Sequence, residues 1–242
     1  MRFLAERLLQ FLLPPQCHCC EKFLKEGQGR ICPDCFSKIL WIEPPLCTLC
    51  GVPFLSREIE DHLCGACLTR RKYFTMARAV GYYEGPFREA IHRWKYEEKS
   101  FLTSFFGEKL TETFRRYWDP GSIDLLIPVP LHSKRLRERG FNQALLLVKE
   151  LSCRTRIPYS KRLLRKRIPT PPQVNLSGKE REKGVRGSFH IQWEEEIEGK
   201  SILLVDDVYT TGATVNECSK VLIKAGAERV DVLTLAHAMR SS

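Results

Sequence analysis

The sequence predicts an α/β protein in which a parallel sheet with helices follows a small cysteine-rich module. Two observations carry this prediction. Short apolar runs alternate with helical patterns from about residue 75 to residue 242, as in βαβ units. Nine of the eleven cysteines lie between Cys17 and Cys67. A chain of 242 residues with 43% hydrophobic residues can bury an α/β core and still carry a second module. We therefore expect two domains, residues 1–74 and 75–242.

The first segment, Met1 to Leu13, is apolar but contains Glu6, Arg7 and Gln10. It has no small-residue cleavage site, so it does not fit a signal peptide, and it is too short to span a bilayer. We expect a short amphipathic helix, no membrane insertion and a cytoplasmic location, where thiols stay reduced.

Eight cysteines form four pairs whose members are separated by two residues. The pairs are Cys17/Cys20, Cys32/Cys35, Cys47/Cys50 and Cys64/Cys67. Two intervening residues let one tight turn present both sulfurs to a tetrahedral ion, and two such knuckles complete a four-thiolate site. A reducing compartment argues against disulfides. We expect a double zinc ribbon with one or two structural Zn²⁺ ions that supply much of the module's folding free energy.

The spacing leaves the grouping of the knuckles open. Pairing the first with the second and the third with the fourth is simplest, but a cross-braced pairing and a single occupied site also fit. Cys19 could replace a neighbouring ligand, and His18 is a more remote alternative. We interpret the isolated Cys153 and Cys218 as core thiols.

The later elements follow from apolar periodicity and from Gly and Pro signals. Gly85-Pro86 begins a helix, Pro120-Gly121 ends one, and Gly226 occupies the C′ position of the last. We expect strands at 77–83, 123–129, 202–205 and 230–236, and helices at 85–96, 101–118, 141–151 and 215–225.

Residues 201–214 join a buried strand, two carboxylates and a small hydroxyl-rich loop. Asp206 and Asp207 end the apolar run, and a helix follows the loop. The loop consists of Thr210, Thr211, Gly212, Ala213 and Thr214. Open α/β sheets bind ligands at this edge, and backbone N–H groups at a helix N-terminus suit a phosphate. The carboxylates would repel phosphate, but they suit ribose hydroxyls or a Mg²⁺ that also holds pyrophosphate. Helix capping alone would explain only one threonine.

A second informative stretch follows the strand at 123–129. Pro130 and Leu131 lead into a basic turn that carries Lys134, Arg135, Arg137 and Arg139. Guanidinium groups bind phosphate oxygens bidentately, as a pyrophosphate site requires. In helical register Arg135 and Arg139 share one face, so we favour these two as ligands. For the other two, a solvent-exposed helix start is an equal alternative.

The net charge of +10 is concentrated in residues 131–190, which contain sixteen Lys/Arg and four Asp/Glu. This indicates an anionic partner such as pyrophosphate, nucleic acid or both, although a solvated basic face is the alternative. Within this region, 165–189 is rich in Pro and Gly, so we expect no regular element there. It is either a mobile lid or a plain surface excursion.

The Val-Asp-Asp-Val-Tyr-Thr-Thr-Gly-Ala-Thr stretch resembles the 5-phosphoribosyl-1-pyrophosphate (PRPP) loop of type I phosphoribosyltransferases. Together with Pro-Val-Pro-Leu, Arg-Leu-Arg-Glu-Arg-Gly-Phe-Asn-Gln and the cysteine module, it resembles the ComF family (ComFC/GntX-like). Tyr83-Glu84-Gly85 and Lys95-Tyr96 match that family's early strand–helix signature, whereas Gly184 departs from the Asn often found there. The resemblance implies a type I phosphoribosyltransferase fold with a lid at 165–189. It also implies that the acidic pair holds the ribose hydroxyls while the loop cradles the 5′-phosphate.

The resemblance further implies a role in DNA uptake or the handling of incoming single-stranded DNA, with competence or DNA-processing proteins as partners. We expect a PRPP- and Mg²⁺-binding phosphoribosyltransferase in which Asp206, Asp207, Arg135 and Arg139 position the substrate and stabilise the leaving group. Its acceptor is not indicated. The alternative is a non-catalytic single-stranded-DNA-binding adaptor with PRPP as a sensed ligand. In that case Arg70-Arg71-Lys72 would contact DNA, and Trp41, Trp94 or Tyr96 could stack on bases, although core packing is favoured for each.

Overall fold

The structure, a computed structural model, describes residues 15–24, 30–54, 56, 60–96, 100–167 and 184–238. The expected helix at 1–13 and the central part of the expected lid lie outside these residues. No helix in the described part of the chain is long and apolar enough to cross a membrane.

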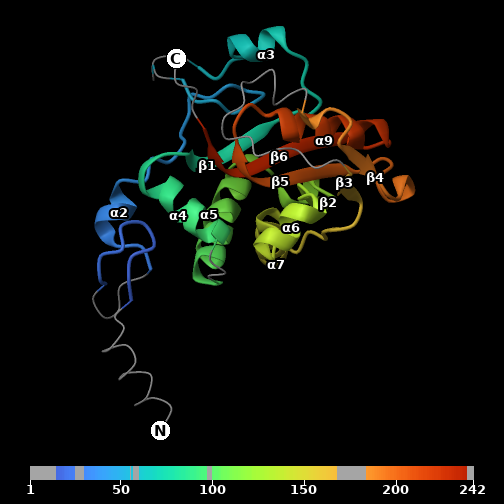
Figure 1. Cartoon of the computed structure of the whole chain (residues 1–242). Helices are drawn as coiled ribbons and strands as arrows, with labels where there is room; N and C mark the ends of the chain where they lie inside the picture. The colour runs from blue at the N-terminus through green and yellow to red at the C-terminus, as the bar shows by residue number, and fades with distance from the viewer. Residues whose placement is uncertain are drawn as a thin grey trace.

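Four parallel strands form the central sheet in the order β1-β6-β5-β2 (Figure 1). They are β1 (Ala77–Tyr82), β2 (Leu125–Pro128), β5 (Ser201–Tyr209) and β6 (Arg229–His237). The two central strands, β5 and β6, are rich in Val, Leu and Ile because both of their faces are covered. Since all four strands are parallel, their carboxyl ends meet at one edge. The predicted parallel sheet is confirmed.

Helices cover both faces of the sheet (Figure 1). Alternate residues of a strand point to opposite faces, so Leu203 and Val205 pack in one buried cluster while Ile202 and Leu204 pack in the other. The first cluster contains α4 (Gly85–Tyr96), α5 (Ser100–Tyr117) and α7 (Gln143–Thr155). The second contains α9 (Ala213–Lys224), β3 (Leu164–Lys166) and β4 (Phe189–Ile191).

Several boundaries differ from those predicted. β5 continues to Tyr209, past the predicted end at 205, because β6 pairs with it as far as His237. α9 begins at Ala213, two residues early, since Gly212 at φ 73° already turns the chain. The basic turn is a helix, α6 (Ser133–Arg139), and the two ends of the segment expected to be irregular form the antiparallel β3–β4 pair. Short 3₁₀ helices occupy Pro120–Ser122 and Glu194–Glu196.

The cysteine-rich segment packs directly on the body, by which we mean residues 75–238. It contains the short helices α2 (Pro33–Ser37) and α3 (Gly65–Thr69). Residues 40–42 run along the outer edge of β1: Tyr82 N–H donates to Leu40 O at 2.9 Å, and Ile42 N–H donates to Val80 O at 3.1 Å. The segment thereby covers an edge strand that would otherwise be open to pairing. The domain boundary at residue 74 stays a prediction.

One core assignment is wrong. Cys218 is buried on the inner side of α9, but Cys153 is exposed. α7 buries Ala144, Leu147, Val148 and Leu151. Position 153 falls on the opposite side of that helix, which turns through 3.6 residues.

Candidate functional site

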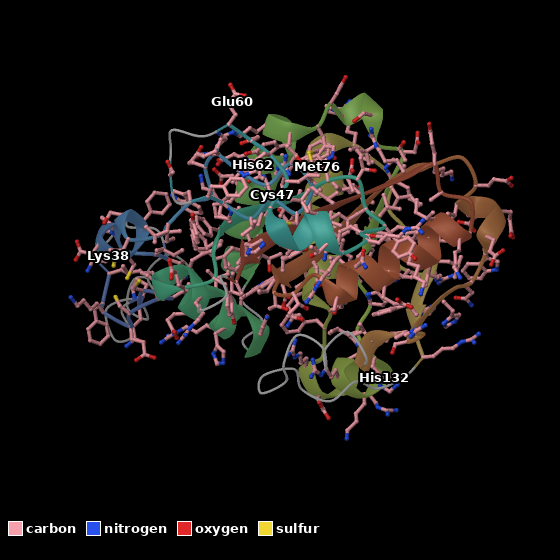
Figure 2. The ribbon with its side chains drawn as sticks, turned by 90° about the horizontal axis from the view of Figure 1, so that it is seen from above. Lys38, Cys47, Glu60, His62, Met76 and His132 are labelled. Atoms are coloured by element: carbon pink, nitrogen blue, oxygen red, sulfur yellow. The ribbon has the colours of Figure 1, made fainter. Side chains whose placement is uncertain are left out.

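The eight paired cysteines form two groups. In each group the four sulfurs lie within 4.8 Å of one another; the groups are Cys17, Cys20, Cys32, Cys35 and Cys47, Cys50, Cys64, Cys67. Consecutive knuckles are therefore paired, the cross-braced pairing is wrong, and neither group is degenerate. Figure 2 places Lys38, which follows the first group, at one end of the molecule and Cys47 of the second group over the sheet.

Sulfur spacing in both groups fits a tetrahedral zinc ion. A Zn–S bond of about 2.3 Å gives sulfur–sulfur separations of roughly 3.8 Å. The Sγ atoms of Cys20 and Cys32 are 3.8 Å apart, and those of Cys50 and Cys64 are 3.7 Å apart. The structure thus contains two four-cysteine sites suited to structural zinc.

Backbone donors stabilise the thiolate form of one ligand in each group. Cys32 N–H donates to Cys17 Sγ at 3.3 Å, and Cys64 N–H donates to Cys47 Sγ at 3.3 Å. Burial opposes ionisation of Cys17, but its backbone donors outweigh burial and lower its pKa to about 6. Burial and the neighbouring Cys17 charge raise the pKa of Cys19 to about 12, so Cys19 stays a neutral thiol. Cys19 belongs to neither group, and nor does His18.

Asp206 and Asp207 lie near the carboxyl end of β5. Asp207 N–H donates to Asp206 Oδ1 at 2.9 Å, and Lys95 Nζ at the end of α4 lies 2.7 Å from Asp207 Oδ2. The Lys95 and Asp207 side chains are 15% and 18% exposed, so water screens this ion pair weakly.

Burial and the adjacent carboxylate decide the charge of the acidic pair. Burial, followed by the charge of Asp207, raises the pKa of Asp206 to about 8. Burial disfavours the charged form of Lys95, but the Asp207 carboxylate outweighs it and raises the pKa of the ammonium. Burial therefore disfavours the charged form of Asp206, while Lys95 lies against Asp207. A cationic ligand would favour ionisation of Asp206.

The loop after β5 depends on a glycine. Gly212 has φ 73°, and a side chain there would collide with the Tyr209 hydroxyl. Thr210, Thr211 and Gly212 form the turn, while Ala213 and Thr214 belong to the first turn of α9. Thr211 Oγ1 accepts a hydrogen bond from Ala213 N–H at 3.3 Å. The first N–H groups of the 12-residue α9 lie next to this turn, which suits an anion.

α6 presents its cations on two different sides. Arg135 and Arg139 are half-buried, whereas Lys134 and Arg137 are exposed. Burial lowers the pKa of Lys166 in β3, and the charge of Arg135 lowers it further. The charge of Arg139 likewise lowers the pKa of Lys95, but the Asp207 carboxylate has the larger effect and raises it. The inward arginines therefore lie within electrostatic reach of the lysines that surround the acidic pair.

Hydrogen bonds hold α6 beside the sheet edge. Gly140 ends α6 at φ 78°, and Asn142 Nδ2 donates to Val129 O at 3.1 Å. Gln143 is buried, and its Nε2 donates to Lys95 O at 3.3 Å. This part of the chain therefore ties the end of β2 to the end of α4. Pro130 and Leu131 follow the last β2–β5 hydrogen bond, Val129 N–H to Val205 O at 2.9 Å, next to the acidic pair.

Sequence reasoning missed the roles of two residues near the acidic pair. Lys95 matches a family signature without a role, and Lys166 is not singled out by any pattern. Only the fold brings Lys95 to Asp207, and no local pattern marks such a pair. Of the aromatic residues considered for base stacking, Trp94 is fully buried, and its Nε1 donates to Thr103 Oγ1.

Comparisons with known proteins match both parts of the chain. The family described as "Double zinc ribbon domain" matches residues 8–68, and the family described as "Phosphoribosyl transferase domain" matches residues 163–242. With the parallel sheet and the two four-cysteine sites, they define the class: a phosphoribosyltransferase-fold protein with an N-terminal double zinc ribbon.

The chain belongs to the ComF family. It is 31% identical to competence protein F of Haemophilus influenzae over 92% of this chain and 97% of the relative. It is 30% identical to DNA utilization protein YhgH of Shigella flexneri over 94% of this chain and 99% of the relative. It is 28% identical to competence protein ComFC of Bacillus subtilis over 88% of this chain and 86% of the relative. A structure of glutamine PRPP amidotransferase from B. subtilis is also similar, at 21% identity and a TM-score of 0.40 over 60% of this chain and 30% of that one.

Proposed function

We propose that this protein binds PRPP with Mg²⁺ at the carboxyl edge of the sheet and transfers the phosphoribosyl group to an acceptor during DNA uptake or DNA processing in the cytoplasm. The observation that carries the proposal is the order of groups along β5 and α9. Two carboxylates are followed within a few residues by a glycine turn and a helix N-terminus. The relatives named for competence and DNA utilization supply the biological context. Competence or DNA-processing proteins are the partners that this context suggests.

Each group in the proposed site has a role that suits its charge. Asp206 and Asp207 would hold ribose hydroxyls or the Mg²⁺ that accompanies pyrophosphate, because hard oxygen ligands suit this ion. The N–H groups of residues 210–214 would hold the 5′-phosphate. Arg135 and Arg139 would hold the pyrophosphate, with Pro130 and Leu131 lining the approach. Mg²⁺ would offset charge on the departing pyrophosphate.

The reaction needs no protein nucleophile. The bond from ribose C1 to pyrophosphate breaks, the acceptor bonds to C1, and pyrophosphate leaves with the electron pair. The transition state resembles an oxocarbenium ion, so positioning and charge stabilisation are the protein's tasks.

Thermal unfolding with PRPP and Mg²⁺ tests the binding step. At a PRPP concentration a hundredfold above Kd, linkage predicts a rise in Tm of roughly 5–10 °C for a chain of this size. The double variant Asp206→Asn/Asp207→Asn should lose this rise. Arg135→Ala/Arg139→Ala should reduce it, whereas Lys134→Ala/Arg137→Ala, on the exposed side of the same helix, should keep it. No rise in the parent protein would contradict the proposal.

A pyrophosphate-release assay separates the transferase from the adaptor alternative. Transfer would be supported if pyrophosphate release requires an added base or single-stranded DNA. The release should also disappear in the Asp206→Asn/Asp207→Asn variant. PRPP binding without release for any acceptor would favour a non-catalytic DNA-binding adaptor that senses PRPP.

A further inference from the structure

A basic pocket lies beside α9, away from the acidic pair. It encloses about 460 Å³, and its cationic and aromatic lining comes from three separate parts of the chain. We use the name basic pocket for the site formed by Arg70, Arg71, Lys72, Tyr73, Arg186 and Lys220. Five of these six side chains are cationic, and Glu217 is the one acidic residue in the lining.

The basic pocket adjoins the proposed PRPP site and shares Ala213 with it, but none of its cationic residues belongs to that site. Its α9 residues are Ala213, Asn216, Glu217 and Lys220, which share one side of that helix at steps of three and four. Asp206 and Asp207 do not line it. Phe74, which follows Tyr73, is buried edge-to-face against Tyr209 with ring centroids 6.5 Å apart, so a buried aromatic contact borders both sites.

Hydrogen bonds hold the linker wall of the pocket in place. Asn216 Oδ1 accepts from Tyr73 N–H at 2.8 Å, and Asn216 Nδ2 donates to Arg71 O at 3.5 Å. The guanidinium of Arg71 lies 5.0 Å from the centre of the Tyr73 ring, and Lys220 Nζ lies 6.0 Å from it. One aromatic ring thus positions two cations from different elements.

The opposite wall is fixed by Glu217. Its Oε1 accepts from Gly187 N–H at 2.9 Å, and its Oε2 lies 3.6 Å from Lys220 Nζ. Its charge is therefore already engaged, and it leaves a surplus of positive charge in the pocket. The turn that carries Arg186 is held next to α9 by the same residue.

We propose that the basic pocket binds the phosphates of a single-stranded nucleic acid. One phosphate group would be neutralised by two cations, whereas five cations spread over three segments suit successive phosphates. The choice of a nucleic acid as the ligand rests on the proposed function in DNA uptake or processing. The position of the site rests only on the pocket and its lining residues. The second zinc site is connected to the pocket through α3. This helix contains Cys67 of the second four-cysteine group, and the next residue after the helix is Arg70.

Anisotropy of a short fluorescent oligothymidylate, titrated with the full-length zinc-loaded protein at several salt concentrations, tests the proposal. Each phosphate contact to a single strand contributes about 0.7 to the slope of log K against log salt. The variant Arg71→Ala/Lys72→Ala/Arg186→Ala should therefore reduce the slope by about 2 and weaken binding by roughly tenfold or more at low salt. Lys38→Ala/Arg88→Ala/Arg115→Ala removes the same charge from exposed positions elsewhere and should change the slope much less.

A variant that removes no charge tests the geometry. Asn216→Ala releases the linker from α9 and should weaken oligonucleotide binding with little change in slope. Equal slopes in the parent and the pocket variant would overturn the proposal. So would failure of the oligonucleotide to bind while inorganic triphosphate binds in the pocket, which would mark a small-polyphosphate site.

The two proposals fail separately. The pocket variant should keep the Tm rise with PRPP and Mg²⁺, because none of its three positions belongs to the PRPP site. If the parent shows no rise in Tm with PRPP, but the pocket variant has the expected smaller salt slope for oligonucleotide binding, the phosphoribosyl proposal fails and the nucleic-acid site stands. If the pocket variant loses both the rise in Tm with PRPP and part of the salt slope, the pocket is part of the phosphoribosyl site.

Discussion

His237 shows how burial decides the chemistry of a single residue at this site. It ends β6, is 6% exposed, and stacks on Tyr209 with ring centroids 4.7 Å apart and planes 21° apart. Neither ring nitrogen has a hydrogen-bond partner within the part of the chain that the structure describes. Burial lowers the pKa of the imidazole to about 4. We expect it to be neutral at physiological pH and to support the loop through Tyr209.

Its titration predicts a pH dependence of stability. Because the unfolded histidine has a pKa near 6.5, the unfolded state binds more protons between about pH 6.5 and 4. The contribution of the neutral ring is therefore complete above pH 6.5 and is lost as pH falls. Between pH 7 and pH 5 this amounts to about 2 kcal/mol of unfolding free energy. Denaturant titration should show a smaller acid loss in His237→Phe, which keeps the stack. Identical pH slopes in the two proteins would contradict the assignment.

At the scale of elements, the third zinc knuckle, Cys47/Cys50, contacts the sheet through backbone atoms. Ala77 N–H at the start of β1 donates to Leu49 O at 2.7 Å. Gly51 follows the knuckle at φ 68°, and a side chain there would collide with Ala77 O. The knuckle can approach β1 this closely only because this position has no Cβ.

Gly51→Ala should therefore lower the unfolding free energy by about 2 kcal/mol, from left-handed strain and a collision with backbone that cannot move aside. Gly65→Ala is the matched control. Gly65 begins α3 with ordinary φ and has no atom within 4 Å of the added methyl, so its replacement should be neutral or slightly stabilising. Guanidinium unfolding of both zinc-loaded variants is the measurement. Equal effects would mean that the contact does not constrain the knuckle.

At the scale of the whole molecule, the zinc sites and the sheet form shared cores. Cys17, Cys32 and Cys35 belong to the buried cluster on the α4–α5–α7 face, while Cys47, Cys50 and Cys67 belong to the cluster on the α9 face. The two sites thus support opposite faces of one sheet.

Removal of zinc should consequently destabilise the entire fold. A structural zinc site contributes on the order of 10–16 kcal/mol, comparable with or above the total stability of about 5–15 kcal/mol typical of a protein. Calorimetry with a strong chelator should show one cooperative transition at a much lower temperature. Cys153→Ser, an exposed thiol outside both groups, should respond like the parent. A separate early transition with the body unchanged would show that the zinc ribbons unfold alone.

The sequence alone determined the parallel α/β class and the cysteines of the two four-cysteine groups, and it predicts the acidic pair with its loop as a ligand site. Each depends on local chemistry: apolar runs bounded by turns, thiols two residues apart, and carboxylates directly before a glycine turn. Even the two sides of α6 followed from helical spacing, since Arg135 and Arg139 lie four residues apart.

Only the tertiary structure decided which groups meet across the chain. It selected consecutive zinc knuckles, brought Lys95 to within 2.7 Å of Asp207, and joined the 70–73 linker to α9 through Asn216. Cys153 shows the same limit, because a helix position becomes core or surface only when its neighbours are known. These contacts join residues far apart in sequence, and their free energies depend on burial and on approach distances that local patterns do not carry.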